Sequence, residues 1–127
     1  MFKYSLNPKK EKSVKVYGRG LRISNKNSQI LCKEISGRPL HKALALMERV
    51  VNKEQSLDGK YYSNASAEIL NLLKSAVNNA EAKGFEAERL IVKASAHEGF
   101  RFFRNRRFKM RRQRRKVTNV QLVLQLS

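Results

Sequence analysis

The densest chemistry in the sequence lies between residues 100 and 117, which read FRFFRNRRFKMRRQRRKV. Ten of these eighteen residues are Arg or Lys, four are Phe, and none is acidic. The arginine guanidinium is a planar fork that binds phosphate through two bonds, while phenylalanine stacks on unpaired bases or wedges into irregular RNA. Basic residues interleaved with aromatic residues therefore predict a nucleic-acid interface.

Few residues could support catalysis or bind a metal. His97 and Glu98 are adjacent in a strand pattern, so their side chains should point to opposite faces, which does not suit an acid–base pair. His41 is expected on a helix surface, and Cys32 is expected to be a small core residue. No Cys/His spacing resembles a zinc site. We therefore expect a protein that is not an enzyme and that uses neither a metal nor a cofactor.

The net charge of +18 is unevenly distributed along the 127 residues. Residues 1–33 carry nine basic residues and one acid, residues 34–100 carry nine of each sign, and residues 101–127 carry ten basic residues and no acid. A merely solvated surface would mix the signs, so this segregation favours a binding footprint for a polyanion.

Length and composition predict one cytosolic domain. A chain of this size, with 41% hydrophobic residues, can form a single modest core. The unpaired Cys32 is typical of a reducing compartment. Neither a signal peptide nor a membrane span is indicated, because no apolar run is long enough.

Three helices are predicted in the charge-balanced middle of the chain. The first should begin after Ser24, whose hydroxyl can cap it, and the second should have Pro39 in its first turn. Ser63 or Asn64 should cap the third helix, and Gly84 should end it.

Strands are predicted outside this helical region, because apolar and polar residues alternate near residues 14–17, 90–97 and 120–126. The predicted order is therefore β-α-α-α-β, then the basic stretch, then β. Adjacent strands pair most simply in an antiparallel manner, which makes the basic stretch the far end of a long hairpin. Such a ribbon is marginally stable alone, and its like charges destabilise it further, so bound phosphates would have to supply counter-charge.

Four blocks of the sequence resemble the universal large-subunit ribosomal protein family numbered twenty-two, in its archaeal and eukaryotic style. They are GRGLRIS (18–24), ISGRPLHKALALMERVV (35–51), ASAEILNLLKSAVNNAEAKGFEAERLIVKASAHEG (65–99) and KVTNVQLVLQL (116–126). The blocks occur in the family's order and extend over nearly the whole chain.

The resemblance implies an α+β fold, with a three-stranded antiparallel sheet packed against about three helices and a long protruding basic β-hairpin. It implies a single domain over 1–127, with a body at about 13–99 and 117–127, an arm at about 100–116 and a basic tail at 1–12. The implied role is structural, in the cytoplasmic large ribosomal subunit. The implied partners are large-subunit rRNA, neighbouring ribosomal proteins and, near the hairpin tip, the nascent peptide in its exit tunnel.

The resemblance and the charge pattern together give the candidate site residues. Residues expected to bind rRNA are Lys15, Arg19, Arg22, Ser24, Lys26, Arg101, Arg104, Arg106, Arg107, Lys109, Arg111, Arg112, Arg114, Arg115 and Lys116. Those expected to stack or wedge are Phe102, Phe103 and Phe108, and those expected at the hairpin tip are Arg107, Phe108, Lys109 and Met110. No Gly or Pro lies between Phe100 and Val117, so Asn105 is the candidate for the turn.

A different class of protein could also use a basic β-ribbon arm. Architectural DNA-binding proteins insert such arms into the minor groove, more often with a proline wedge at the tip and an evident dimer face. Neither feature is visible in this sequence. Architectural DNA binding is therefore the alternative to the ribosomal role.

Overall fold

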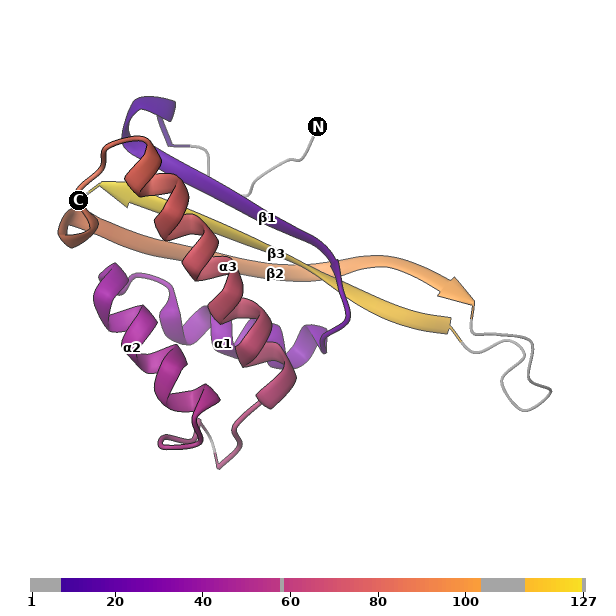
Figure 1. Cartoon of the computed structure of the whole chain (residues 1–127). Helices are drawn as coiled ribbons and strands as arrows, with labels where there is room; N and C mark the ends of the chain where they lie inside the picture. The colour runs from indigo at the N-terminus through magenta and orange to yellow at the C-terminus, as the bar shows by residue number, and fades with distance from the viewer. Residues whose placement is uncertain (1–7, 58, 104–113, 127) are drawn as a thin grey trace.

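The computed structural model describes residues 8–57, 59–103 and 114–126, which form a sheet and a layer of helices. The sheet consists of β1 (Ser13–Leu21), β2 (Leu90–Phe103) and β3 (Arg114–Leu126); the helices are α1 (Asn25–Ile35), α2 (Leu40–Val51) and α3 (Ser63–Ala82). Two short 3-10 helices, η1 (Lys10–Lys12) and η2 (Ala87–Arg89), precede β1 and β2. The predicted α+β class and the predicted element order are both confirmed (Figure 1).

The sheet is antiparallel throughout, and its strand order is β1-β3-β2. Leu124 of β3 pairs with Val14 on one side and with Val92 on the other. The strand that comes last in the chain is thus the central one. This position explains why Val123 breaks the apolar–polar alternation of β3, because a central strand can be buried on both faces, and Val123 is only 3% exposed.

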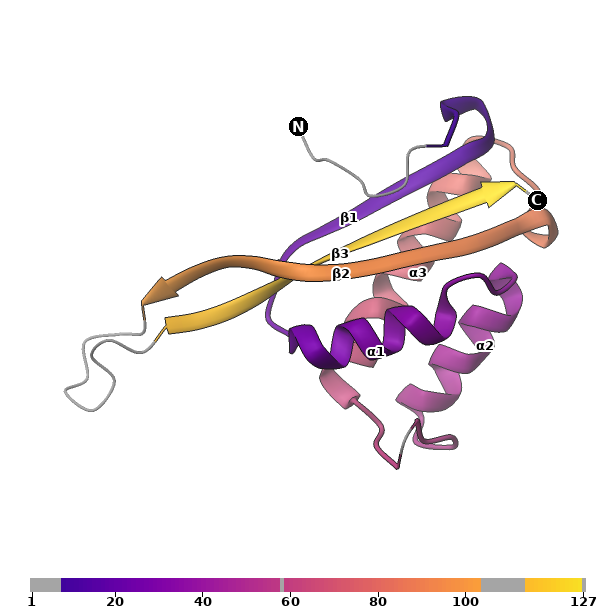
Figure 2. The same ribbon diagram turned by 180° about the vertical axis from the view of Figure 1, so that it is seen from behind.

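The hydrophobic core lies between the sheet and the helices. α3 crosses one face of the sheet, while α1 and α2 lie beside it towards β2 (Figure 1 and, from behind, Figure 2). The largest fully buried side chains come from every one of these elements except β1: Leu31, Ile35, Leu40, Met47, Ile69, Leu73, Leu90, Leu122, Leu124, Val50, Val92 and Val120. No described residue from 100 to 116 belongs to this core.

Two of the predicted helix ends are confirmed. The Ser24 hydroxyl accepts a hydrogen bond from the Asn27 backbone N–H at 3.4 Å and so caps α1. Beyond α3, Gly84 adopts a φ of +79°, which glycine adopts without strain. The N–H groups of Gly84 and Phe85 then bond to the carbonyls of Glu81 and Ala80, both at 3.0 Å, and this pattern ends the helix.

The other two helix starts differ from the prediction. Pro39 lies immediately before α2 rather than in its first turn. Neither Ser63 nor Asn64 caps α3; the capping position is held by Tyr62, in a left-handed conformation with a φ of +46° and no side-chain hydrogen bond. The backbone supplies the first bond instead, because the Tyr62 carbonyl accepts from the Ser66 N–H at 2.8 Å.

The sheet narrows from three strands to two where β1 and β2 both lose regular register. The register shifts between Gly18 and Leu21 in β1 and between Glu98 and Arg101 in β2. β1 then turns away to α1, while β2 and β3 continue as a pair beyond the helices (Figure 2). We call the residues at this point, Tyr17, Gly20, His97, Gly99 and Asn119, the arm root.

The pairing of β2 with β3 reaches Phe103 opposite Arg114. The predicted tip and its turn at Asn105 lie outside the described residues. The hairpin, and the division of the chain into body and arm, therefore stay predictions.

Candidate nucleic-acid interface

The described part of the arm brings cations on two strands opposite one another. Arg101 pairs with Lys116, and both side chains are exposed. Farther out, Phe102 pairs with Arg115, and Phe103 pairs with Arg114. Like charges directly opposite in a sheet are destabilising, so this stretch of ladder is well suited to bound anions.

Arg101 already has one anionic neighbour. Its Nη2 lies 3.0 Å from Oε2 of Glu98, and both side chains are nearly half exposed. Exposed ion pairs contribute little to stability, typically about 0–1 kcal/mol. Glu98 therefore holds the guanidinium at the base of the arm without preventing it from exchanging this carboxylate for a phosphate.

The second basic region surrounds the end of β1 and the start of α1. Arg19, Arg22 and Lys26 are exposed, whereas Lys15 is partly buried within β1. The exposed Ser24 hydroxyl accepts the capping bond, which leaves its O–H able to donate to an anion. The first turn of α1 contains no acid, so its positive dipole end is not offset locally.

Hydrogen bonds to β3 join the two basic regions. The Gly20 N–H donates to the Asn119 Oδ1 at 2.9 Å, and the buried Thr118 hydroxyl donates to the Ile23 carbonyl at 2.8 Å. These bonds hold the end of β1 and the residues that follow it against β3, close to Lys116 in sequence. The two basic regions, some eighty positions apart in sequence, therefore meet at one end of the sheet (Figure 1).

An aromatic cluster lies on the arm root between them. The Tyr17 hydroxyl and the Asn119 Nδ2 each lie 3.3 Å from the His97 Nε2, and the Tyr17 and His97 ring centroids are 6.2 Å apart. Since the Asn119 Oδ1 accepts from Gly20, the Asn119 amide presents its N–H to His97. Phe100, 53% exposed, lies close to Gly20. The rings of Tyr17, His97 and Phe100 are therefore available for stacking near the two basic regions.

Sequence reasoning did not identify this cluster. The sequence feature that could have indicated the cluster is the occurrence of Gly18, Gly20 and Gly99, together with His97, near the ends of predicted strands. His97 and Glu98 bond to different partners, Glu98 to Arg101 and His97 to Tyr17 and Asn119. This agrees with the prediction that they do not form an acid–base pair.

The remaining candidates for chemistry are structural. Cys32 is buried, and burial raises the pKa of its thiol to about 12, so the thiol stays protonated and unreactive. His41 is exposed on α2, as predicted. Within residues 8–57, 59–103 and 114–126, no three His, Cys, Asp or Glu side chains gather as metal ligands. In the same part of the chain, no helix is long and apolar enough to cross a membrane.

Several predicted site residues have no described position. These are Arg104, Arg106, Arg107, Phe108, Lys109, Met110, Arg111 and Arg112. Phe102, Phe103, Arg114 and Arg115 are placed by their backbone in β2 and β3. The fold therefore places the segments that carry Arg19, Arg22, Ser24, Lys26, Arg101 and Lys116 at one end of the sheet, with Lys15 farther along β1.

Comparison with known proteins places the chain in a family. Residues 16–125 match the family model described as ribosomal protein L22p/L17e. The chain is 33% identical to the large ribosomal subunit protein uL22 of Methanococcus aeolicus, and the match covers 76% of each protein. It is 32% identical to the uL22 protein of Methanopyrus kandleri, with 76% of each covered, and 34% identical to that of Methanococcus maripaludis, with 77% of each covered. The chain therefore belongs to the ribosomal protein L22p/L17e family, whose members are structural and non-enzymatic proteins.

Proposed function

We propose that this chain binds large-subunit rRNA through the two basic regions that meet at the arm root, and that its arm reaches the nascent-peptide exit tunnel. Family membership makes the chain a structural constituent of the large ribosomal subunit, a cytoplasmic particle. The proposal adds which surface binds RNA and how the arm is used.

The proposal rests on one observation, which is that the two basic regions meet at the same end of the sheet. Gly20 and Ile23 are tied to β3 beside the base of the arm, so Arg19, Arg22 and Lys26 extend the surface that Arg101 and Lys116 begin. Several exposed cations at one end of a body whose middle is charge-balanced suit a long phosphate backbone better than a small anion.

Each residue type has a distinct part in this proposal. The arginine forks and lysines neutralise phosphates, which positions the protein without reading sequence. Phe102, Phe103 and Phe108 stack on unpaired bases or enter crevices in folded RNA. Arg107, Phe108, Lys109 and Met110 form the tip, which lies near the nascent peptide. The tunnel position is supported by the family resemblance, and neighbouring ribosomal proteins are expected around the body.

Architectural DNA binding, the alternative considered from the sequence, finds no specific support. The family match extends from residue 16 to residue 125 and therefore includes residues 100–116. The ribosomal role is therefore the one we carry forward.

The dependence of RNA affinity on salt concentration tests the proposed footprint. For six to ten phosphate contacts, we expect the purified protein to lose roughly 10³–10⁵ in affinity for structured large-subunit rRNA between about 50 and 200 mM salt. Replacing Arg111, Arg112, Arg114 and Arg115 with Gln should flatten this dependence, because each lost contact lowers the logarithmic slope by about 0.7–0.9. Fluorescence anisotropy across a salt series measures the slope.

A control variant tests whether the salt dependence is determined by where the four positive charges are removed or only by how many are removed. Lys42, Lys53, Lys60 and Lys74 are exposed on the helical side, and replacing them with Gln also removes four charges. We expect this variant to keep the wild-type slope. Equal slopes in the arm variant and the wild type would show that these four arginines do not contact phosphate.

A further inference from the structure

Phe100 is the most exposed large hydrophobic side chain in the part of the chain that the structure describes, at 53% against 39% for Tyr61. It lies in β2 where the register with β3 shifts, at the base of the arm, and it does not belong to the hydrophobic core. A single exposed hydrophobic residue needs no explanation by itself. The groups around the ring therefore decide what it can bind.

The ring of Phe100 rests on the backbone at the end of β1. A Cβ atom on Gly20 would stand 3.1 Å from the Phe100 Cε1 and 3.5 Å from its Cζ, so a side chain at residue 20 would press on the ring. The Gly20 N–H is in turn held by the Asn119 Oδ1 at 2.9 Å. One side of the ring is thus supported by hydrogen-bonded backbone. A planar ligand can stack on the exposed part of the ring with little loss of side-chain freedom.

Asn119 also determines which nitrogen of the neighbouring His97 carries the proton. Because the Asn119 Oδ1 accepts from a backbone N–H, its Nδ2 faces the His97 Nε2, 3.3 Å away, and Nδ2 can only donate. The His97 Nε2 is therefore an acceptor, and the neutral ring carries its proton on Nδ1. Tyr17 also bonds to Nε2, so the exposed His97 keeps its Nδ1–H as a donor for a ligand.

The charges around Phe100 favour an anionic ligand. Arg19 precedes Gly20 in the chain, and Arg101 follows Phe100. The three strands together contain a single acid, Glu98, and Arg101 already pairs with it at 3.0 Å. A ligand suited to this site combines a flat ring with negative charge, and an RNA nucleotide whose base is unstacked has both.

We propose that Phe100 binds one unpaired nucleotide of the large-subunit rRNA at the arm root. The base stacks on the exposed part of the Phe100 ring, the adjoining phosphates lie against Arg19 and Arg101, and the His97 Nδ1–H donates to an acceptor on the same RNA strand. A base held within a duplex does not present its face to the ring, so the site selects single-stranded RNA. The inference rests on the proposed function, because the nucleotide belongs to the RNA that the two basic regions bind.

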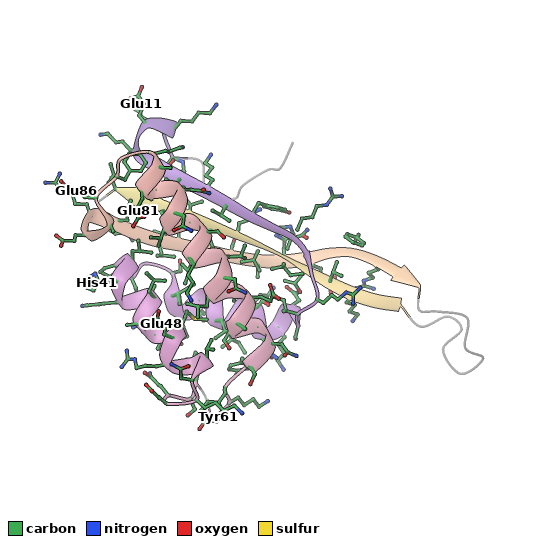
Figure 3. All side chains as sticks on the ribbon, in the orientation of Figure 1. Glu11, His41, Glu48, Tyr61, Glu81 and Glu86 are labelled. Atoms are coloured by element: carbon green, nitrogen blue, oxygen red, sulfur yellow. The ribbon has the colours of Figure 1, made fainter. Side chains whose placement is uncertain are left out.

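Tryptophan fluorescence tests the stack, because the chain contains no tryptophan of its own. The emission of Phe100→Trp should be quenched when single-stranded oligouridylate is added, and much less by an RNA duplex of the same length, since only an unpaired base can stack on the indole. Tyr61→Trp is the control, because Tyr61 is also exposed but lies on the opposite side of the helices from the sheet (Figure 3). Its emission should not change. Equal quenching by single strand and duplex, or at both positions, would overturn the proposal.

Affinity measured across a salt series separates the stack from the phosphate contacts. Phe100→Leu should weaken binding to structured large-subunit rRNA roughly 5- to 150-fold, which is the effect of losing one stacked base. The logarithmic salt slope should keep its wild-type value, because no cation is removed. Phe100→Tyr keeps an aromatic ring and should restore most of the affinity, while Tyr61→Leu should have no effect. Fluorescence anisotropy measures all four proteins.

Three results of this series would overturn the stack. They are an unchanged affinity in Phe100→Leu, a flattened salt slope in the same variant, and a loss of affinity that Phe100→Tyr does not restore. A failure of the proposed function would instead appear in the wild type itself, as a shallow salt slope. The two proposals can therefore fail separately.

Discussion

Gly99 occupies the most crowded position of the arm root. A Cβ atom there would stand 2.8 Å from Cγ2 of Val117 and 2.9 Å from Oδ1 of Asn119. Asn119 cannot move away freely, because its Oδ1 also accepts the Gly20 N–H. The absence of a side chain at residue 99 thus allows β3 to approach β2 closely where the register shifts.

Gly99→Ala should therefore lower the free energy of unfolding by about 1–3 kcal/mol, the usual effect of overpacking. Val117→Ala removes the nearest clashing methyl group, so the double variant should be destabilised by less than the sum of the single changes, by about 0.5 kcal/mol or more. Equilibrium urea unfolding of the four proteins measures this coupling.

Gly59→Ala serves as the control for this cycle. Gly59 has a φ of +76° but nothing within 4 Å of its added Cβ, so only backbone strain is expected. Its effect should add to that of Val117→Ala. If the effects of Gly99→Ala and Val117→Ala on the free energy of unfolding are also additive, the close approach of Val117 is not the reason that residue 99 must be glycine.

Single residues show how far local sequence determines structure in this chain. Ser24 and Gly84 were predicted correctly because a hydroxyl cap and a left-handed glycine act within one helical turn. The start of α3 was predicted wrongly, since Tyr62 adopts a positive φ that no tyrosine prefers. The arm-root cluster could not be predicted, because it depends on the register of three strands that are distant in sequence.

At the scale of elements, the order of helices and strands follows from periodicity, whereas the order of strands in the sheet does not. The apolar run Leu122, Val123 and Leu124 was nevertheless a signal that β3 is central. The extension of β2 and β3 contributes nothing to the core among the described residues. We therefore propose that the body, at about 13–99 and 117–127, folds without the arm.

Deleting Arg101–Arg115 and joining Phe100 to Lys116 through an Asn-Gly turn should leave a folded domain. The core side chains all remain, and Asn-Gly is a favoured two-residue hairpin turn. Circular dichroism should show a cooperative thermal transition. Leu73→Ala, a fully buried position on α3, provides the contrast, because it should lower stability by about 2–5 kcal/mol. A shortened chain without a cooperative transition would mean that the arm supports the core.

At the scale of the whole molecule, the excess positive charge lies apart from the charge-balanced region that contains α2 and α3. Nine of the ten acids lie within residues 34–100, which include the helices α2 and α3, while one end of the sheet carries the exposed cations of the two basic regions. A net charge of +18 on so small a body produces strong self-repulsion in the free protein.

Added NaCl should therefore raise the melting temperature of the free protein. The Debye length falls from about 30 Å at 0.01 M to about 10 Å at 0.1 M salt, which screens the repulsion. The arm deletion removes nine basic residues and lowers the net charge from +18 to +9, so its melting temperature should rise by less over the same range. Differential scanning calorimetry of both proteins measures the two increments. Equal increments would show that repulsion within the arm does not reach the body.

The central position of β3 also has a consequence for how the chain is made. Val14 pairs with Leu124, which is synthesised 110 positions later, so the ladder between β1 and β3 cannot form before then. At about 5–20 residues per second, that interval is roughly 6–22 s, and during it β1, β2 and all three helices have emerged without the strand that joins them. The cations of residues 101–116 also emerge before most of β3. Folding therefore competes in time with the capture of the nascent chain by cellular polyanions. The interval between the synthesis of Val14 and that of Leu124 sets how long a chaperone must shield the incomplete chain.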